Sequence, residues 1–166
     1  MEKFYPTITT DIAWTLLYNA VAQGTFSAAA YWNDPHHQPE FLDWAWLATL
    51  NNFTNNPDSQ SKISLFDFCL FLAYKNNLIQ LENLVLLGSP QDGVIQPWQS
   101  AFFGFWDANG DLVNMTEQAI YTQDYIGLQT LDKEGRLTQT VAPGVAHQDW
   151  VNDQAVFVKY ILPWLT

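Results

Sequence analysis

Asp92 and His147 are the two residues of this sequence best placed to do chemistry together. Asp92 follows an apolar segment, residues 84–87, within a few positions, and His147 follows residues 137–141 after a loop with proline and glycine. A carboxylate beside an imidazole fixes its tautomer and stabilises the imidazolium, so that the imidazole can take a proton from a nucleophile. Spacing alone leaves open the alternative of an aspartate in a turn and a histidine on the surface.

Two strands of a parallel sheet would bring this pair together. Residues 83–88, Asn-Leu-Val-Leu-Leu-Gly, are typical of a strand buried on both faces, and residues 137–141 predict a second strand. In open α/β sheets, functional groups lie on loops beyond the carboxyl ends of the strands. The sequence therefore predicts an α/β layer architecture. The order of acid and then histidine is the second half of the Ser, Asp, His order of α/β-hydrolases.

The remaining segments predict helices and one tight turn. Four segments have the apolar spacing or composition of helices: residues 10–24, 41–50, 61–77 and 149–162. Gly24 is expected to end the first helix, and Asp149 to begin the last. The pair Asn109-Gly110 is a strong signal for a hairpin or tight turn between residues 102–107 and 111–115.

Composition and charge exclude several classes of protein. The chain has 166 residues, 48% of them apolar and 14% charged, which favours one folded domain over a disordered chain. Asp and Glu number 17 against 6 Lys and Arg, a net charge of -11, so the chain repels nucleic acid and anionic membranes. The longest apolar run, residues 63–74, is shorter than the roughly 20 residues of a membrane span. The lone Cys69 is expected to be a buried, inert thiol.

Two further groups of residues suggest metal binding, and both have simpler interpretations. Residues 107–111, Asp-Ala-Asn-Gly-Asp, are similar to a calcium-binding loop, but the glycine falls at the fourth position instead of the sixth, which favours a tight turn. Asp34, His36 and His37 could join a metal site, yet a proline-rich loop explains them without one. We therefore expect no metal and no cofactor.

Several blocks of the sequence resemble one known family in the same order along the chain. The blocks are residues 31–37 (Tyr-Trp-Asn-Asp-Pro-His-His), 88–100 (beginning Gly-Ser-Pro-Gln-Asp-Gly-Val-Ile), 103–107 (Phe-Gly-Phe-Trp-Asp), 121–124 (Tyr-Thr-Gln-Asp), 146–147 (Ala-His) and 161–165 (Ile-Leu-Pro-Trp-Leu). They resemble the palmitoyl-protein thioesterases, most closely the lysosomal type 2 branch. The resemblance runs from about residue 12 to the end of the chain.

This resemblance implies a fold, an activity and a location. Members of the family are α/β-hydrolases of the lysosome that cleave thioesters of long-chain acyl groups with a Ser-Asp-His triad. The triad aspartate of the family falls on Asp92 and its histidine on His147, the same residues that the strand-end argument selects. The resemblance thus implies thioester hydrolysis of S-acylated proteins or peptides, or of acyl-CoA. Val94 and Ile95 are candidates for an acyl groove, with continuation of the core as the alternative.

A nucleophile with the sequence G-x-S-x-G is not found in this chain. Six serines are present, none in that context: Ser27, Ser59, Ser61, Ser64, Ser89 and Ser100. We therefore expect the chain to correspond to the second half of the family's enzyme and to be inactive alone. Three explanations stay open: a truncated gene model, a protein completed by another chain, or a non-catalytic module that binds acyl groups or a partner. An unpaired sheet edge would also favour self-association.

The expected organisation is one domain, residues 1–166, with a helical cap region over about residues 1–80. Residues 81–166 would carry the terminal strands, the loops with Asp92 and His147, and the last helix. The chain as given has no secretory signal segment at its start, and the resemblance implies a lysosomal location. Asn52 and Asn114 lie in N-glycosylation sequons, which permit passage through the secretory pathway without showing it.

Overall fold

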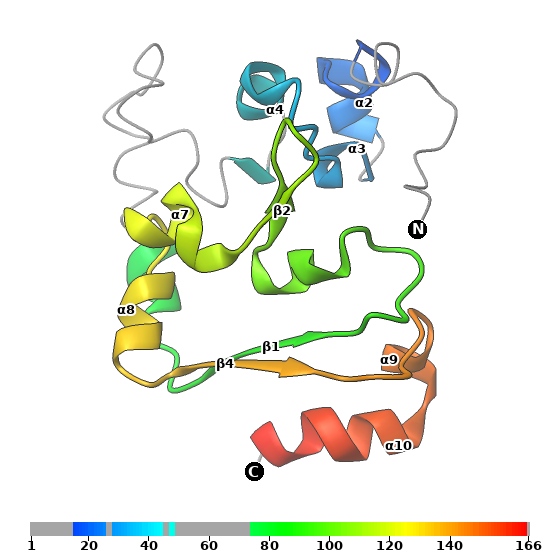
Figure 1. Ribbon diagram of the computed structural model, residues 1–166, viewed down its shortest axis with the longest axis vertical. Helices are drawn as coiled ribbons and strands as arrows, with labels where there is room; N and C mark the ends of the chain where they lie inside the picture. Colours follow the sequence, from blue (N-terminus) through cyan, green and yellow to red (C-terminus); the bar gives the residue numbers. More distant parts are fainter. Residues whose placement is uncertain (1–14, 26–27, 45–46, 49–73, 166) are drawn as a thin grey trace. The chain divides into compact units, whose positions relative to one another are not determined.

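The computed structural model describes residues 15–25, 28–44, 47–48 and 74–165 (Figure 1). The chain divides into two compact units, residues 1–74 and residues 75–166, which are described separately below. Within the described residues, no helix has the length and hydropathy needed to cross a membrane. The organisation as one domain with a cap region stays a prediction.

Unit 1, residues 1–74, is helical where it is described. Its elements are α2 (Ala20–Thr25), α3 (Ala28–Tyr31) and α4 (Gln38–Trp44). The helix predicted over residues 10–24 is interrupted, because the Asn19 carboxamide caps two helical segments. Its Nδ2 donates to the carbonyl of Leu16 at 3.0 Å, and its Oδ1 accepts the N–H groups of Val21 and Ala22 at 3.1 and 3.0 Å. The helix α2 then continues through Gly24 to Thr25, so the expected stop at Gly24 is wrong by one residue.

Tyr18 organises the described part of unit 1. Its ring packs edge-on against Phe41, with centroids 6.2 Å apart, in a buried cluster that includes Ala48. The Tyr18 hydroxyl donates to the carbonyl of Trp32 at 2.6 Å and accepts the N–H of Asp34 at 3.0 Å. Burial raises the pKa of this hydroxyl well above its ordinary value, although the hydrogen bond from the Asp34 backbone opposes the shift. Tyr18 therefore joins the end of α3 to the turn that precedes α4.

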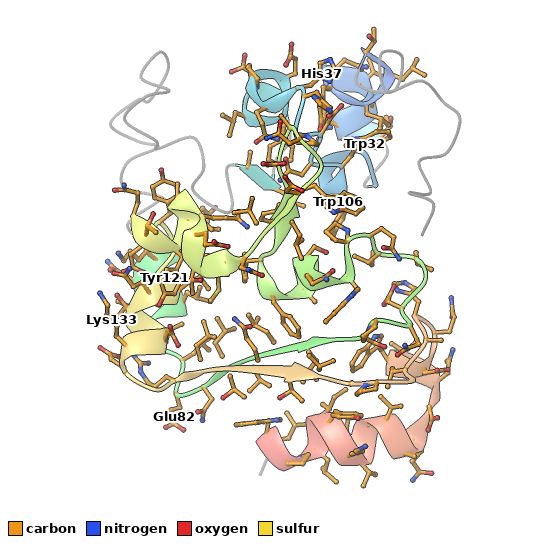
Figure 2. All side chains as sticks on the ribbon, in the orientation of Figure 1. Trp32, His37, Glu82, Trp106, Tyr121 and Lys133 are labelled. Carbon is orange, nitrogen blue, oxygen red and sulfur yellow. The ribbon has the colours of Figure 1, made fainter. Side chains whose placement is uncertain are left out.

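Unit 2, residues 75–166, contains two small sheets and several short helices. In chain order the elements are β1 (Leu84–Gly88), η3 (Trp98–Phe102), β2 (Phe105–Trp106), β3 (Leu112–Val113), η4 (Met115–Glu117), α7 (Ala119–Thr122), α8 (Leu128–Lys133), β4 (Leu137–Val141), α9 (Asp149–Asn152), α10 (Gln154–Val156), η5 (Phe157–Ile161) and η6 (Leu162–Trp164). In Figure 2, Tyr121 marks α7, Lys133 marks the end of α8, and Glu82 lies just before β1.

β1 and β4 form a parallel pair, which confirms both predicted strands and their direction. Leu84 lies opposite Leu137, and Gly88 opposite Val141, so both strands end at the same edge of the sheet. Figure 1 shows the short helix η3 on one face of this pair and the C-terminal helical segment on the other. A Cβ at Gly88 would lie 3.1 Å from Phe102, so glycine is what allows η3 to approach the strand this closely.

The start of the parallel pair is fixed by Arg136, the residue before β4. Its backbone carbonyl accepts the N–H of Leu84 at 2.7 Å, and its guanidinium donates to the carbonyls of Ile79 and Leu81. A Cβ at Gly127, just before α8, would overlap with the Ile79 side chain, and the φ of Gly127 is 93°, so the position requires glycine. These contacts hold the register of β1 against β4, and through it the positions of the two loops that follow these strands.

The predicted turn of the hairpin is present in the structure, whereas the predicted C-terminal helix is divided. β2 and β3 pair antiparallel around residues 107–111, which form the predicted tight turn. Asp107 Oδ1 accepts the N–H groups of Asn109 and Asp111, both at 2.9 Å. The last helix begins at Asp149 as expected but is divided, because Asp153 Oδ1 accepts the N–H groups of Ala155 and Val156 and caps a new segment.

Candidate functional site

Asp92 and His147 lie side by side at the carboxyl ends of the parallel strands. His147 Nδ1 lies 3.0 Å from each of the two carboxylate oxygens of Asp92. The backbone N–H of His147 also donates to the backbone carbonyl of Asp92 at 3.1 Å. The structure therefore brings together two residues 55 positions apart, as the strand-end argument expected.

The loop after β1 is shaped so that the Asp92 carboxylate turns toward the loop after β4. Ser89 is buried; its Oγ accepts the N–H of Gln91 and its carbonyl accepts the N–H of Asp92, both at 3.1 Å. Asp92 Oδ1 in turn accepts the N–H groups of Val94 and Ile95, at 3.1 and 2.8 Å. This is the local turn chemistry favoured by aspartate, and it holds the carboxylate at one rotation.

The same hydrogen bonds determine the charge of Asp92. Burial raises the pKa of this carboxyl, but the N–H of Ile95, the His147 ring and the N–H of Val94 together outweigh it, so that the pKa lies below its ordinary value. Asp92 is therefore an anion at neutral pH. Its side chain is only 10% exposed, whereas that of His147 is 38% exposed.

The geometry assigns the two nitrogens of the His147 ring. An ionised carboxylate only accepts hydrogen bonds, so Nδ1 carries the proton that lies between the ring and Asp92. In the neutral ring, Nε2 then has a free lone pair, and in the described part of the chain no protein group is hydrogen-bonded to it. An imidazole held in this tautomer can accept a proton at Nε2 while the carboxylate stabilises the resulting imidazolium.

The loop after β4 is held at both ends. Ala142 and Val145 are buried in a cluster with Val156 of α10. Asp149 Oδ2 accepts the N–H of Ala146 at 2.8 Å, so the first turn of α9 holds the residue that precedes His147. Between these anchors, the N–H of Gly144 donates to the side-chain Oε1 of Gln91 at 2.6 Å. Gln91 was not among the residues predicted from the sequence, although it lies directly before Asp92 in the block of residues 88–100.

Val94 and Ile95, the two candidate acyl contacts, lie on the turn that Asp92 caps. Their side chains are 63% and 43% exposed, so they are not part of the core of unit 2. Apolar side chains left exposed beside the Asp92–His147 pair are available to an apolar ligand. Contact with an acyl chain stays a prediction.

The other residues discussed from the sequence either have hydrogen-bond partners in the structure or lie outside the described residues. Asp34 accepts the N–H of His36 at 2.9 Å, and its second oxygen lies 2.8 Å from His37 Nδ1, in the turn before α4. Within residues 15–25, 28–44, 47–48 and 74–165, no group of three or more His, Cys, Asp or Glu side chains could hold a metal. Asn114 is exposed, and its side chain bonds Glu117. Several other candidates lie outside the described residues: Ser27, Asn52, Ser59, Ser61, Ser64 and Cys69.

Comparisons with known proteins agree on one family. A family model described as "Palmitoyl protein thioesterase" matches residues 2–147. Lysosomal thioesterase PPT2-B of Xenopus laevis is 41% identical over 141 residues, covering 84% of this chain and 45% of the relative. Lysosomal thioesterase PPT2 of Homo sapiens is 34% identical over 167 residues, covering 100% of this chain and 51% of the relative. The Lysosomal thioesterase PPT2 homolog of Drosophila melanogaster is 35% identical, covering 99% and 53%. The chain spans about half the length of these relatives.

Proposed function

Because this chain belongs to the palmitoyl protein thioesterase family, we propose that it carries the acid and base of a thioesterase active site. The substrate class would be thioesters of long-chain fatty acids, on proteins, peptides or coenzyme A. The observation that carries the proposal is the contact of the Asp92 carboxylate with Nδ1 of His147, at 3.0 Å, beyond the ends of two parallel strands.

In the proposed reaction His147 acts first as base and then as acid. Nε2 takes the hydroxyl proton of a serine nucleophile as that oxygen attacks the thioester carbonyl, and Asp92 stabilises the imidazolium. The imidazolium then gives its proton to the departing sulfur, leaving an acyl-enzyme and a free thiol. Water, deprotonated by His147, releases the fatty acid and restores the serine. The serine would come from sequence outside this chain, in a G-x-S-x-G segment.

The apolar pair Val94 and Ile95 would contact the acyl chain. Both follow Asp92 directly and are exposed, and each CH₂ group that a ligand buries contributes about 0.8 kcal/mol. Replacing Ile95 by alanine should weaken binding of a long acyl chain more than that of a short one. Equal losses for acetyl and palmitoyl thioesters would argue against this contact.

The edge of β1 that faces away from β4 would receive a further strand from the portion that supplies the serine. In a parallel ladder, successive residues point their N–H and C=O groups to opposite sides. Leu84 and Gly88 bond to the β4 side, so Val85 and Leu87 point to the other edge. Among the described residues, β4 is the one strand that pairs with β1.

The two strands also differ in composition in the way that an inner and an edge strand differ. β1 reads Leu-Val-Leu-Leu-Gly, whereas β4 reads Leu-Thr-Gln-Thr-Val with Gln139 and Val141 exposed. The sequence predicted β1 to be buried on both faces, but Leu84–Leu87 are only half-buried in the structure. A neighbouring strand on the open edge, with the layers that cover it, would complete this burial.

We propose a lysosomal location, because the relatives from Xenopus laevis, Homo sapiens and Drosophila melanogaster are named lysosomal thioesterases. Under this proposal the site works in an acidic compartment. Only the neutral His147 ring can accept the serine proton, so the dependence of the hydrolysis rate on pH tests His147 as the base. A rate independent of pH over the acidic range would argue against His147 as the base.

The proposal is tested by isolating the native protein, measuring its intact mass and N-terminal sequence, and assaying hydrolysis of a palmitoyl thioester. We expect a longer species with a G-x-S-x-G segment to be active, its His147→Ala variant to be inactive, and the 166-residue chain alone to be inactive. Co-expression of the complementary portion should restore activity to the 166-residue chain. A longer species in which His147→Ala keeps full activity would overturn the proposal.

A non-catalytic role in binding acyl groups or a partner is the second candidate, favoured by the exposure of Val94 and Ile95. It predicts that the 166-residue chain binds a fatty acyl thioester without hydrolysing it. Titration with a fluorescent palmitoyl thioester, using Ile95→Asp as the variant, separates the two roles. Saturable binding with no turnover in every native form would favour this candidate.

A further inference from the structure

We propose that Gln91 is a positioning residue that ties the loop carrying Asp92 to the loop carrying His147. This inference rests on the proposed function, because positioning matters only if the pair transfers protons. Its basis is the hydrogen bond from the Gly144 N–H to the Gln91 side-chain oxygen, at 2.6 Å, between residues 53 positions apart. Gln91 touches neither the His147 ring nor the Asp92 carboxylate by any hydrogen bond of the described structure.

The two loops meet through hydrogen bonds at three places. Gln91 accepts from Gly144, the Asp92 carbonyl accepts from the His147 N–H, and the Asp92 carboxylate meets the His147 ring. The last two involve the reacting residues themselves. The hydrogen bond between Gln91 and Gly144 is therefore the one that joins the two loops without involving Asp92 or His147.

Gly144 is exposed and has no side chain, so we infer that its hydrogen bond to Gln91 contributes most to its position. Gly144 has a φ of 84° and is exposed, and a Cβ built on it would find no atom within 4 Å. Ala142, two residues earlier, and Val145, the next residue, are buried. The tip of the loop at Gly144 is therefore exposed between two buried residues. Its hydrogen bond to the Gln91 side chain connects it to the loop that follows β1.

Gln91 is itself held by the turn that positions Asp92. Its N–H donates to the buried Ser89 hydroxyl at 3.1 Å, while its side chain is directed at the other loop. We infer that a movement of the Gly144 loop is passed on in part to His147, three residues later, against the anchors at Val145 and Ala146. The Asp92 carboxylate stays in its own turn, so the geometry of the pair changes. Small misplacements of this kind lower the rate of proton transfer even when the groups remain present.

The test compares three variants of the 166-residue chain. Gln91→Met keeps the length of the side chain but removes the acceptor, Gln91→Glu keeps an acceptor oxygen, and Gln148→Met is the matched control. Gln148 is an exposed glutamine beside His147, and its side chain bonds Asn152 on its own helix. Gln91 is also exposed, so its replacement should leave the thermal midpoint within a few degrees of the unaltered chain.

The readouts are amide exchange at Gly144 and the tautomer of His147, measured by ¹⁵N NMR. In Gln91→Met we expect exchange at Gly144 to rise about 3- to 10-fold, the size of one lost hydrogen bond, and the Nδ1–H tautomer fraction to fall. Gln91→Glu should restore both, and Gln148→Met should change neither. An unchanged tautomer in Gln91→Met would overturn the proposal, whether or not exchange at Gly144 rises.

A kinetic measurement on the form that carries the serine completes the test. We expect Gln91→Met to lower kcat about 3- to 10-fold with KM changed less than about twofold, and Gln91→Glu to recover most of the loss. Loss of thioesterase activity in His147→Ala tests the proposed function separately. If that variant keeps its activity, the proposed function fails while the NMR result still decides whether Gln91 orients His147.

Discussion

The described part of the chain contains two Asp-His pairs with nearly the same contact and different environments. In unit 1, Asp34 Oδ2 lies 2.8 Å from His37 Nδ1, three residues away. In unit 2, Asp92 lies 3.0 Å from His147 Nδ1, 55 residues away. Figure 2 labels His37 among the helices of unit 1. The side chains of Asp34 and His37 are 3% and 20% exposed, and those of Asp92 and His147 are 10% and 38% exposed.

The two aspartates use their remaining hydrogen bonds differently. Asp34 organises its own turn: Oδ1 accepts the His36 N–H, and its carbonyl accepts the His37 N–H and a donor from the Gln38 side chain. Asp92 also caps a local turn, but its histidine comes from another strand. A distance alone therefore does not identify a reactive pair. The candidate site is the one that two strand ends assemble and that leaves the imidazole more exposed.

Replacing the two histidines should give the largest difference in kcat between the two pairs. In the form that carries the serine, His147→Gln should lower kcat for palmitoyl thioester hydrolysis by at least about 10⁴-fold, because it removes the base and acid. His37→Gln should lower kcat less than about fivefold. The two variants are compared by steady-state kinetics, with circular dichroism as the control for folding. Comparable losses would mean that the two pairs are not functionally distinct.

The aspartates should show the same contrast at a smaller size. Asp92→Asn keeps the shape of the side chain but reverses the preferred hydrogen bond to Nδ1, so kcat should fall about 10³- to 10⁴-fold. Asp34→Asn should leave kcat within about fivefold. The tautomer of His147, measured by NMR, is the direct check, and an unchanged tautomer in Asp92→Asn would contradict the assigned role.

Replacing Asp34 should lower the free energy of unfolding more than replacing Asp92 does, the reverse of the order expected for kcat. Asp34→Asn removes the charge from a buried carboxylate that bonds both the His36 N–H and the His37 ring, and should lower the free energy of unfolding by about 1–3 kcal/mol. Tyr18→Phe should lower it by about 1–2 kcal/mol, because the Trp32 carbonyl and the Asp34 N–H lose their partner. Urea unfolding measures both. A smaller loss of unfolding free energy for Asp34→Asn than for Asp92→Asn would contradict a structural role of the Asp34–His37 pair.

The smallest effect concerns the pH dependence of stability. The pKa of Asp92 in the folded chain lies below its ordinary value of 3.8. The stabilisation that this shift provides is therefore complete above the ordinary value and is lost as the pH falls through the lower folded value. Urea unfolding of the unaltered chain and of Asp92→Asn should thus converge as the pH is lowered below about 4. A difference that grows as the pH falls would reverse the sign of the shift.

Much of the fold that positions the site could be read from local patterns. The apolar run before Gly88 and the segment Leu137–Val141 predicted β1 and β4, and the pair Asn109-Gly110 predicted the turn between β2 and β3. Asp149 was expected to begin the last helix, and it does. These features depend on the periodicity of apolar residues and on turn chemistry, which act over a few residues.

The predicted helix bounds were wrong where a polar side chain accepts backbone N–H groups and so interrupts the helix. Asn19 divides the first predicted helix and Asp153 divides the last, each by accepting backbone N–H groups that the pattern of apolar residues does not reveal. The half-burial of Leu84–Leu87 was missed for another reason. Composition indicates the environment to which a strand is suited, whereas the actual burial depends on which neighbours pair with it.

For the site, the amino-acid sequence alone was enough to identify the residue types, the strand ends that carry them and the family to which the chain belongs. Three contacts became visible in the folded chain: His147 faces Asp92 through Nδ1, Asp34 and His37 form a local pair, and Gln91 reaches Gly144. The first and the last could not be predicted because a loop at the end of a strand has no fixed direction until the register of β1 against β4 is set. That register brings residues more than 50 positions apart within hydrogen-bonding distance.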